Sequence, residues 1–171
     1  LMFNSSTIEI SAAALRVNLE FIHGALGGTE LCSVVKGNAY GHGIGAFAPL
    51  AQELGVKRFA VYSASEAVNL LEHVETGSNI YIMGDVDGAS LDWAVEQGIA
   101  FNVFESERLD QAISAARSLK KKARIHLEIE TGMHRTGFKL DCLPSVLDSC
   151  KKNGDALEII GICRHLAGAE N

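Results

Sequence analysis

Long apolar runs are absent from this sequence of 171 residues. No stretch approaches the roughly 20 consecutive apolar residues that a membrane-spanning helix needs. The first residues also lack the charged region and the apolar core of a signal peptide, so we expect no targeting segment. Leu1 stands before Met2, and we therefore expect the sequence to be a domain cut from a longer protein.

Clustered basic residues are scarce as well. The formal net charge is −6, and the only basic run, residues 120–122, closes a predicted helix, where lysines complement the helix dipole. A nucleic-acid surface needs Lys and Arg clustered on one face. The composition therefore argues against nucleic acid as a partner.

The four cysteines form no Cys-x-x-Cys pair, and no histidine follows them at zinc-finger spacing. We therefore expect no metal site. Cys32 and Cys163 lie within apolar segments, as reduced core cysteines commonly do. A reducing cytoplasm is the location that fits this cysteine usage best.

Two hydrophobic periods alternate along the chain and predict an α/β protein. Segments with the pattern of a strand are separated by helix patterns, and the links between them contain Gly or Asn. Predicted strands cover 32–35, 58–62, 79–83, 100–104, 123–131 and 157–165, after a short alternating strand at 7–10. Predicted helices cover 46–54, 65–73, 88–97, 106–119 and 143–151, after a first helix that Ser11 caps. Repetition of this unit implies a parallel sheet with helices packed outside it.

Six such units, beginning with strand 32–35, suggest a (β/α)8 barrel of the TIM type. A complete barrel usually takes about 250 residues, so the barrel would be truncated two units short. The chain ends just past the sixth strand, and an open sheet would leave unpaired edges at its first and sixth strands. The alternative is a doubly wound open sheet that is complete in itself.

The first strand ends on Lys36 and is followed by a loop with four glycines between positions 37 and 45. Glycines allow the backbone to approach a ligand closely. A lysine at the carboxyl end of a buried strand is poorly hydrated, so its amine should become nucleophilic, as a Schiff base with an aldehyde cofactor requires. From this stretch alone, a salt-bridged structural lysine is the competing interpretation.

The strand at 123–131 carries carboxylates on one face. Its apolar face holds Ile125, Leu127 and Ile129, and its polar face holds His126, Glu128 and Glu130. Helices cover the outside of such a sheet, so we expect the carboxylates to point into the barrel. Buried carboxylates need a cation or a donor, and the nearest cation in the sequence is Arg135.

Residues 34–43 (VVKGNAYGHG) resemble the pyridoxal-phosphate lysine motif of the alanine racemases, with Gly37 where alanine is more usual. The resemblance implies that Lys36 carries pyridoxal 5'-phosphate and acts as a catalytic base. It also implies that Tyr40 contacts the phosphate.

Residues 131–138 (TGMHRTGF) are a second match to this family. The residues that match its pattern include Met133, Arg135 and the two glycines. The family arginine at this place reaches the phenolic oxygen of the cofactor. A loop arginine that only bridges Glu128 or Glu130 is the alternative. Many family members carry a carbamate-modified lysine seven positions before the arginine, where this chain has Glu128. We hypothesise that Glu128 orients Arg135 directly.

Residues 161–167 (GICRHLA) are the third match. The family histidine here, His165 in this chain, stacks on the pyridine ring. The resemblance therefore implies residues 1–171 as a partial cofactor-binding barrel, with residues 1–10 as a strand of an absent C-terminal β domain.

The family activity implied is racemisation of L- and D-alanine, which supplies D-alanine for peptidoglycan, in a cytoplasmic homodimer. The second base and most of the phosphate cup would lie in the C-terminal part, so we expect this chain alone to be inactive. A broad-specificity or serine racemase, a barrel-type decarboxylase and a non-catalytic pyridoxal-phosphate homeostasis module are the alternatives.

Overall fold

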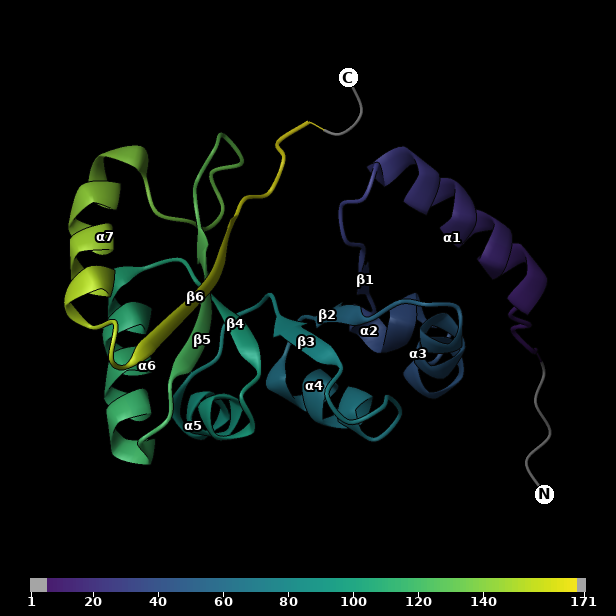
Figure 1. Ribbon diagram of the computed structural model, residues 1–171, viewed down its shortest axis with the longest axis horizontal. Coiled ribbons are helices and arrows are strands. Elements are labelled where there is room, and N and C mark those ends of the chain that lie inside the picture. The colour runs from purple at the N-terminus through teal and green to yellow at the C-terminus, as the bar shows by residue number, and fades with distance from the viewer. Residues whose placement is uncertain (1–5, 169–171) are drawn as a thin grey trace. The chain divides into compact units, whose positions relative to one another are not determined.

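A computed structural model describes residues 6–168 of the chain as alternating strands and helices (Figure 1). The strands are β1 (Cys32–Val34), β2 (Arg58–Val61), β3 (Asn79–Ile82), β4 (Ala100–Val103), β5 (Ala123–Glu128) and β6 (Leu157–Cys163). The helices are α1 (Ala12–Leu26), α2 (Lys36–Tyr40), α3 (Ile44–Glu53), α4 (Ala64–Leu71), α5 (Gly88–Gln97), α6 (Ser106–Leu119) and α7 (Leu143–Lys152), with a 3-10 turn, η1 (Leu140–Cys142), before α7. Helices α5 and α6 have the predicted bounds.

The strands form one sheet in the order β1-β2-β3-β4-β5-β6. The pairs β1–β2, β3–β4, β4–β5 and β5–β6 are parallel. A doubly wound sheet reverses its strand order at a switch point. No reversal occurs in the described residues, so the order is that of a TIM-type (β/α)8 barrel, of which these residues hold six strands.

The chain divides into two compact units, Leu1–Ile80 and Tyr81–Asn171. Strand β3 contributes to both: the N–H of Asn79 donates to the carbonyl of Lys57 (3.2 Å) in the first unit. In the second unit, Tyr81 pairs with Ala100 of β4.

The core of the first unit is built on β2, whose Phe59 and Val61 are fully buried. Helices α2 and α4 pack against this strand. Helix α1 begins as predicted, since the Oγ of Ser11 accepts a hydrogen bond from the N–H of Ala14 (3.2 Å). It ends at Gly27, which adopts the left-handed conformation common at helix C-termini.

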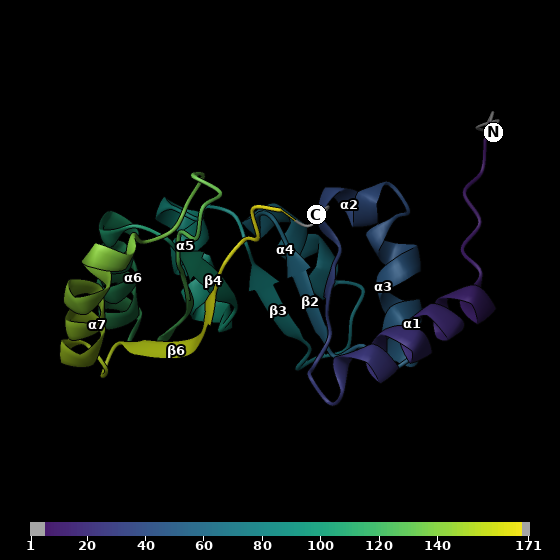
Figure 2. The same ribbon diagram turned by 90° about the horizontal axis from the view of Figure 1, so that it is seen from above.

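In the second unit, α5 and α6 lie side by side and pack against β4 (Figures 1 and 2). Helix α6 also covers β5, and Ile125 and Leu127 of that strand are fully buried. His126 points to the opposite face and is only half-buried. The predicted alternation of β5, with the apolar face towards the helices, is confirmed.

Residues 7–10 pair with no strand within the described part of the chain, and residues 1–5 lie outside it. Their assignment to a strand of a C-terminal β domain stays a prediction. One expectation is wrong. Cys32 is exposed and not in the core, because β1 is an edge strand of the sheet. Cys163 is half-buried.

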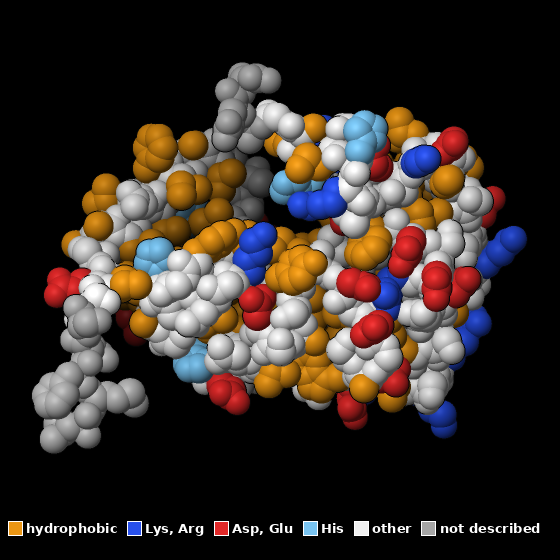
Figure 3. Space-filling model, turned by 180° about the vertical axis from the view of Figure 1, so that it is seen from behind, with side chains coloured by type: hydrophobic (Ala, Val, Ile, Leu, Met, Phe, Trp, Pro, Cys, Tyr) orange, Lys and Arg blue, Asp and Glu red, His pale blue; other side chains and the backbone are white. Residues whose placement is uncertain are grey.

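Figure 3 shows one face of the molecule, on which acidic and basic side chains are interspersed without a continuous basic area. Within residues 6–168, no helix has both the length and the apolar character needed to cross a membrane. The same residues contain no group of three or more His, Cys, Asp or Glu side chains arranged to hold a metal ion.

Candidate active site

Lys36 lies at the carboxyl end of β1, as predicted, and one residue, Val35, separates it from the strand. The preceding residue, Val35, is fully buried, and its N–H donates to the carbonyl of Ala60 in β2 (2.8 Å). The side chain of Lys36 is half-buried. The carboxyl ends of parallel strands are the side on which barrels carry their chemistry.

The backbone after Lys36 turns into a left-handed helical turn. Gly37, Asn38, Ala39 and Tyr40 have φ angles of 60°, 55°, 56° and 53°. The turn is closed by hydrogen bonds such as the one from the N–H of Gly41 to the carbonyl of Gly37 (3.0 Å). Each non-glycine residue in this conformation costs about 1–2 kcal/mol, so the turn needs support from its surroundings. The sequence predicted only a loop here.

Two side chains supply that support. The Oδ1 of Asn38 accepts a hydrogen bond from the N–H of Ile44, the first residue of α3 (2.8 Å). The Oε1 of Glu66, in α4, accepts one from the N–H of Gly37 (2.7 Å). Tyr40 leaves the turn with 64% of its side chain exposed, so its hydroxyl is available to a ligand.

The loop that carries Arg135 returns tightly onto the end of β5. The N–H of Glu130 donates to the carbonyl of Phe138 (3.0 Å), and the N–H of Phe138 donates to the carbonyl of Glu128 (2.8 Å). A Cβ at Gly137 would lie 2.5 Å from the nitrogen of Glu130, and Gly137 has a φ of +116°. Only glycine fits this position, because the clash would be with backbone.

Both carboxylates of the β5 end hold this loop, one on each side of Arg135. The Oε1 of Glu130 accepts hydrogen bonds from the N–H groups of His134 (3.0 Å) and Gly132 (2.5 Å), and these bonds lower the pKa of Glu130. The Oε1 of Glu128 accepts one from the Oγ1 of Thr136 (2.8 Å). The residues before and after Arg135 are thereby fixed.

The direct contact that we hypothesised between Glu128 and Arg135 is not formed: within the described residues no ion pair joins them. Glu128 is 5% exposed and is satisfied by neutral donors, Thr136 and the Nδ2 of Asn102 (3.0 Å). Glu128 therefore acts on the residue next to Arg135. The guanidinium of Arg135 is exposed at the surface of the loop.

Asn102 of β4 is the centre of a polar network that sequence reasoning missed. Its Nδ2 also donates to the carbonyl of Met83 (3.1 Å), and its Oδ1 accepts from the hydroxyl of Tyr81 and from the Sγ of Cys163 (3.2 Å). Burial raises the pKa of the Cys163 thiol, which keeps it a donor. A polar residue inside the apolar strand β4 was the available signal.

His165 lies two residues beyond β6 and is exposed. The Oγ1 of Thr131 donates to its carbonyl (3.4 Å), which links the segment after β6 to the Arg135 loop. Met133, in the same loop, is 42% exposed. The second unit thus brings Glu128, Met133, Arg135 and His165 to the carboxyl ends of β5 and β6, and the first unit places Lys36 and Tyr40 at the carboxyl end of β1.

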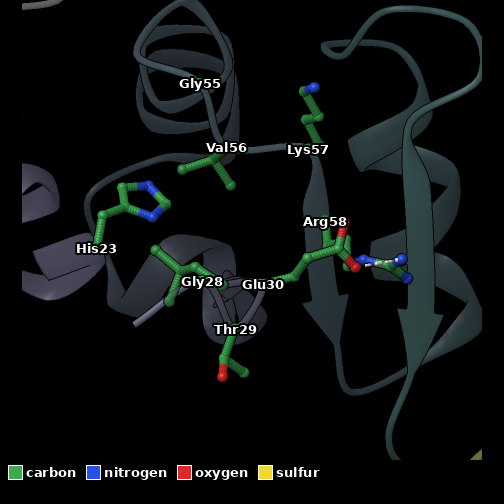
Figure 4. A pocket seen from close by; sticks show the side chains of 9 residues that line it. His23, Gly28, Thr29, Glu30, Gly55, Val56, Lys57 and Arg58 are labelled. Atoms are coloured by element: carbon green, nitrogen blue, oxygen red, sulfur yellow. Dashed lines mark ion pairs between the residues drawn. The ribbon is translucent and has the colours of Figure 1, made fainter. Parts of the chain in front are cut away.

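The pocket in Figure 4 is not the candidate site. It has a volume of about 340 Å³ and lies at the amino ends of β1 and β2, where Glu30 and Arg58 form an ion pair (2.5 Å). In a barrel this end carries stability and the opposite end carries chemistry. At the carboxyl end of β5, an open pocket of about 670 Å³ is lined by residues of the Arg135 loop and of η1, among them Glu130, Thr131 and Lys139.

Comparisons with known proteins place the chain in a family. The family model of the alanine racemase N-terminal domain matches residues 10–171. Among curated proteins, an alanine racemase of Acidithiobacillus ferrooxidans is 32% identical over 165 residues, which cover 95% of this chain and 44% of that protein.

Solved structures are similar over the same part. The alanine racemase of Streptomyces lavendulae matches with a TM-score of 0.85 and 27% identity, over 94% of this chain and 42% of that one. The histidine racemase of Leuconostoc mesenteroides subsp. sake matches with a TM-score of 0.86 and 25% identity, over 94% of this chain and 43% of that one. The chain therefore spans less than half the length of these relatives.

Proposed function

The chain belongs to the alanine racemase N-terminal domain family, and we propose that it holds pyridoxal 5'-phosphate on Lys36 for the racemisation of alanine. The observation that carries this proposal is the position of Lys36. It lies at the carboxyl end of β1, half-buried, with the backbone on both sides fixed by hydrogen bonds from other elements. A lysine whose backbone is held at a defined place is suited to covalent attachment of an aldehyde.

The chemistry of the candidate residues in each unit would suit this cofactor. Lys36 would hold it covalently, the hydroxyl of Tyr40 would contact its phosphate, and the exposed guanidinium of Arg135 would face its phenolic oxygen. His165 would stack on its ring. A cation beside the phenolic oxygen keeps that oxygen anionic, and the two carboxylates that fix the Arg135 loop would keep the cation in place.

The cofactor, when bound, supplies the electron sink for the negative charge that develops at the substrate Cα. The amine of Lys36, once released from the cofactor by the substrate, would move the proton at this Cα on one face. The base for the opposite face would come from the part of the protein that follows the matched domain, in a partner subunit. We therefore propose a cytoplasmic homodimer as the active form, and no useful racemase activity for residues 1–171 alone.

A racemase for another amino acid is the second candidate. The similarity to a histidine racemase, with a TM-score of 0.86, supports it, because the same barrel serves a different substrate there. A comparison of the turnover of alanine, serine and histidine by the longest natural form of the protein would separate the two. Alanine should have the highest kcat/KM, and a preference for histidine or serine would reverse the order.

The cofactor assignment has a direct test. The chain is mixed with pyridoxal phosphate, reduced with borohydride and digested, and the modified lysines are mapped by mass spectrometry. We expect one dominant adduct on Lys36, its loss in Lys36→Arg, and no change in the matched control Lys57→Arg, at the amino end of β2. Adducts spread over several lysines, or retained in Lys36→Arg, would contradict the proposal.

A further inference from the structure

Glu66 joins two segments of the first unit that are far apart in sequence. Its Oε2 accepts hydrogen bonds from the N–H groups of Tyr62 (2.7 Å) and Ser63 (3.3 Å), at the beginning of α4. Its Oε1 accepts one from the N–H of Gly37 (2.7 Å), the residue directly after Lys36. One half-buried carboxylate therefore serves three backbone donors.

Only part of this arrangement is explained by helix capping. In a capping box, the acidic residue at the third helical position bonds the backbone N–H of the N-cap residue. The bond from Ser63 to Oε2 does this, and the Oγ of Ser63 accepts from the N–H of Glu66 in return (3.3 Å). The other oxygen of Glu66, Oε1, is not needed for the cap, and it accepts the hydrogen bond from the N–H of Gly37.

The bond to Gly37 lies at the start of the left-handed turn. Lys36 is not among the residues with a positive φ angle, and Gly37 is the first residue of the turn that has one. On the other side of Lys36, the N–H of Val35 is held by the carbonyl of Ala60 (2.8 Å). The two bonds fix the backbone before and after Lys36, and with it the direction in which the lysine side chain leaves the sheet.

We propose that Glu66 is a positioning residue for Lys36, and that it sets the rate at which the amine attaches the cofactor. The proposal deepens the proposed function and rests on it for the role of Lys36. Glu66 itself touches neither the amine nor the reacting atoms. Its effect passes through the backbone N–H of Gly37.

Glu66→Gln separates this role from helix capping. The glutamine keeps the volume of the side chain but has one acceptor oxygen and one NH2 donor. The oxygen should face the two donors of the cap, Tyr62 and Ser63. The NH2 group then faces the N–H of Gly37. Both groups are donors, so the hydrogen bond to Gly37 is lost, while the hydrogen bonds that cap α4 are retained.

The matched control is Ser11→Ala. It removes the N-cap hydrogen bond of α1, also in the first unit, and leaves the contacts of Gly37 unchanged. All measurements are made at a temperature at which circular dichroism shows the wild type and both variants fully folded. Ser11→Ala then measures what a loss of stability in the first unit does by itself.

The readouts are amide hydrogen exchange at Gly37, followed by NMR, and the rate of borohydride-trapped adduct formation on Lys36. A hydrogen bond to a carboxylate contributes enough free energy for about a tenfold effect. In Glu66→Gln we expect Gly37 to exchange about tenfold faster and the adduct on Lys36 to form about tenfold more slowly. Ser11→Ala should match the wild type in both readouts.

The outcomes separate this inference from the proposed function. If the wild type forms no adduct on Lys36, the proposed function fails, and the role of Glu66 in attaching the cofactor fails with it. If the wild type forms the adduct but Glu66→Gln forms it at the same rate, only the positioning role is wrong. An equal slowing in Ser11→Ala would show that general destabilisation causes the effect, which also overturns the role of Glu66.

Discussion

Alanine substitutions at Gly37 and Gly137 should differ strongly in their effect on stability, although both glycines have positive φ angles. Gly37 lies in the ordinary left-handed region (φ 60°, ψ 40°), and a Cβ there would meet no atom within 4 Å. The strain of about 1–2 kcal/mol is partly offset by about 0.4–1 kcal/mol from the smaller conformational freedom of the unfolded chain. We expect Gly37→Ala to cost about 1.6 kcal/mol or less.

Gly137→Ala combines two penalties. Its φ of +116° lies outside the left-handed region that other residues tolerate, which costs about 1–3 kcal/mol. The added Cβ would lie 2.5 Å from the nitrogen of Glu130 and 2.7 Å from the carbonyl carbon of Ile129. These are backbone atoms at the end of β5 that cannot rotate away, so overpacking adds about 1–3 kcal/mol. We expect a total loss of about 2–6 kcal/mol, or a loop that opens to avoid it.

Urea unfolding followed by circular dichroism measures the free energy of unfolding of both variants and the wild type. If the loop opens instead, the amides of Glu130 and Phe138, which close it, should lose their protection from hydrogen exchange in Gly137→Ala only. The reasoning would be refuted if Gly137→Ala kept both its stability and this protection, or if Gly37→Ala cost as much as Gly137→Ala.

Three further predictions concern the groups that hold the two candidate segments. Because the N–H groups of His134 and Gly132 lower the pKa of Glu130 in the folded state, the stabilisation of the loop should be complete above the ordinary value of 4.5. This stabilisation should be lost as the pH falls through the lowered pKa of Glu130. The NMR signals of the His134 and Gly132 N–H groups should then shift with pH, and Glu130→Gln should abolish that shift. Glu128→Gln can keep its oxygen towards Asn102 and turn its NH2 group towards the hydroxyl of Thr136, which would then accept; because the charged acceptor is lost, it should destabilise by about 1 kcal/mol and weaken the binding of pyridoxal phosphate, and unchanged binding would exclude a role for Glu128. Asn38→Ala removes the side-chain acceptor of the N–H of Ile44, at the start of α3, and places alanine in the left-handed turn; urea unfolding should show a loss of about 1–2 kcal/mol, whereas wild-type stability would contradict the supporting role of Asn38.

The two candidate segments are held by the same principle. Lys36 lies between Val35 and Gly37, whose N–H groups bond to Ala60 and Glu66. Arg135 likewise lies between His134 and Thr136, which are bonded to Glu130 and Glu128. In both segments the structural hydrogen bonds are made by the residues beside the charged one. The amine of Lys36 and the guanidinium of Arg135 form no ion pair within the described residues. Such an arrangement preorganises charged groups for a ligand at little cost on binding.

Local sequence alone was enough to predict the six strands of the sheet, the longer helices and their order. Strand and helix have different hydrophobic periods, and Ser11 and Gly27 mark the ends of α1 by capping rules that need no tertiary contact. The placement of Lys36 and Arg135 after β1 and β5 followed from the same order, because parallel strands all end on one edge of the sheet.

Tertiary structure decided what depends on residues far apart in the chain. The left-handed turn after Lys36 is supported by Glu66, 29 residues away, and no local pattern encodes that bond. The partners of Glu128 could not be predicted either, since Asn102 reaches it only through the pairing of β4 with β5. Cys32 was misplaced for the same reason: an apolar segment predicts a strand, but only the order of the strands in the sheet shows which one lies at the exposed edge.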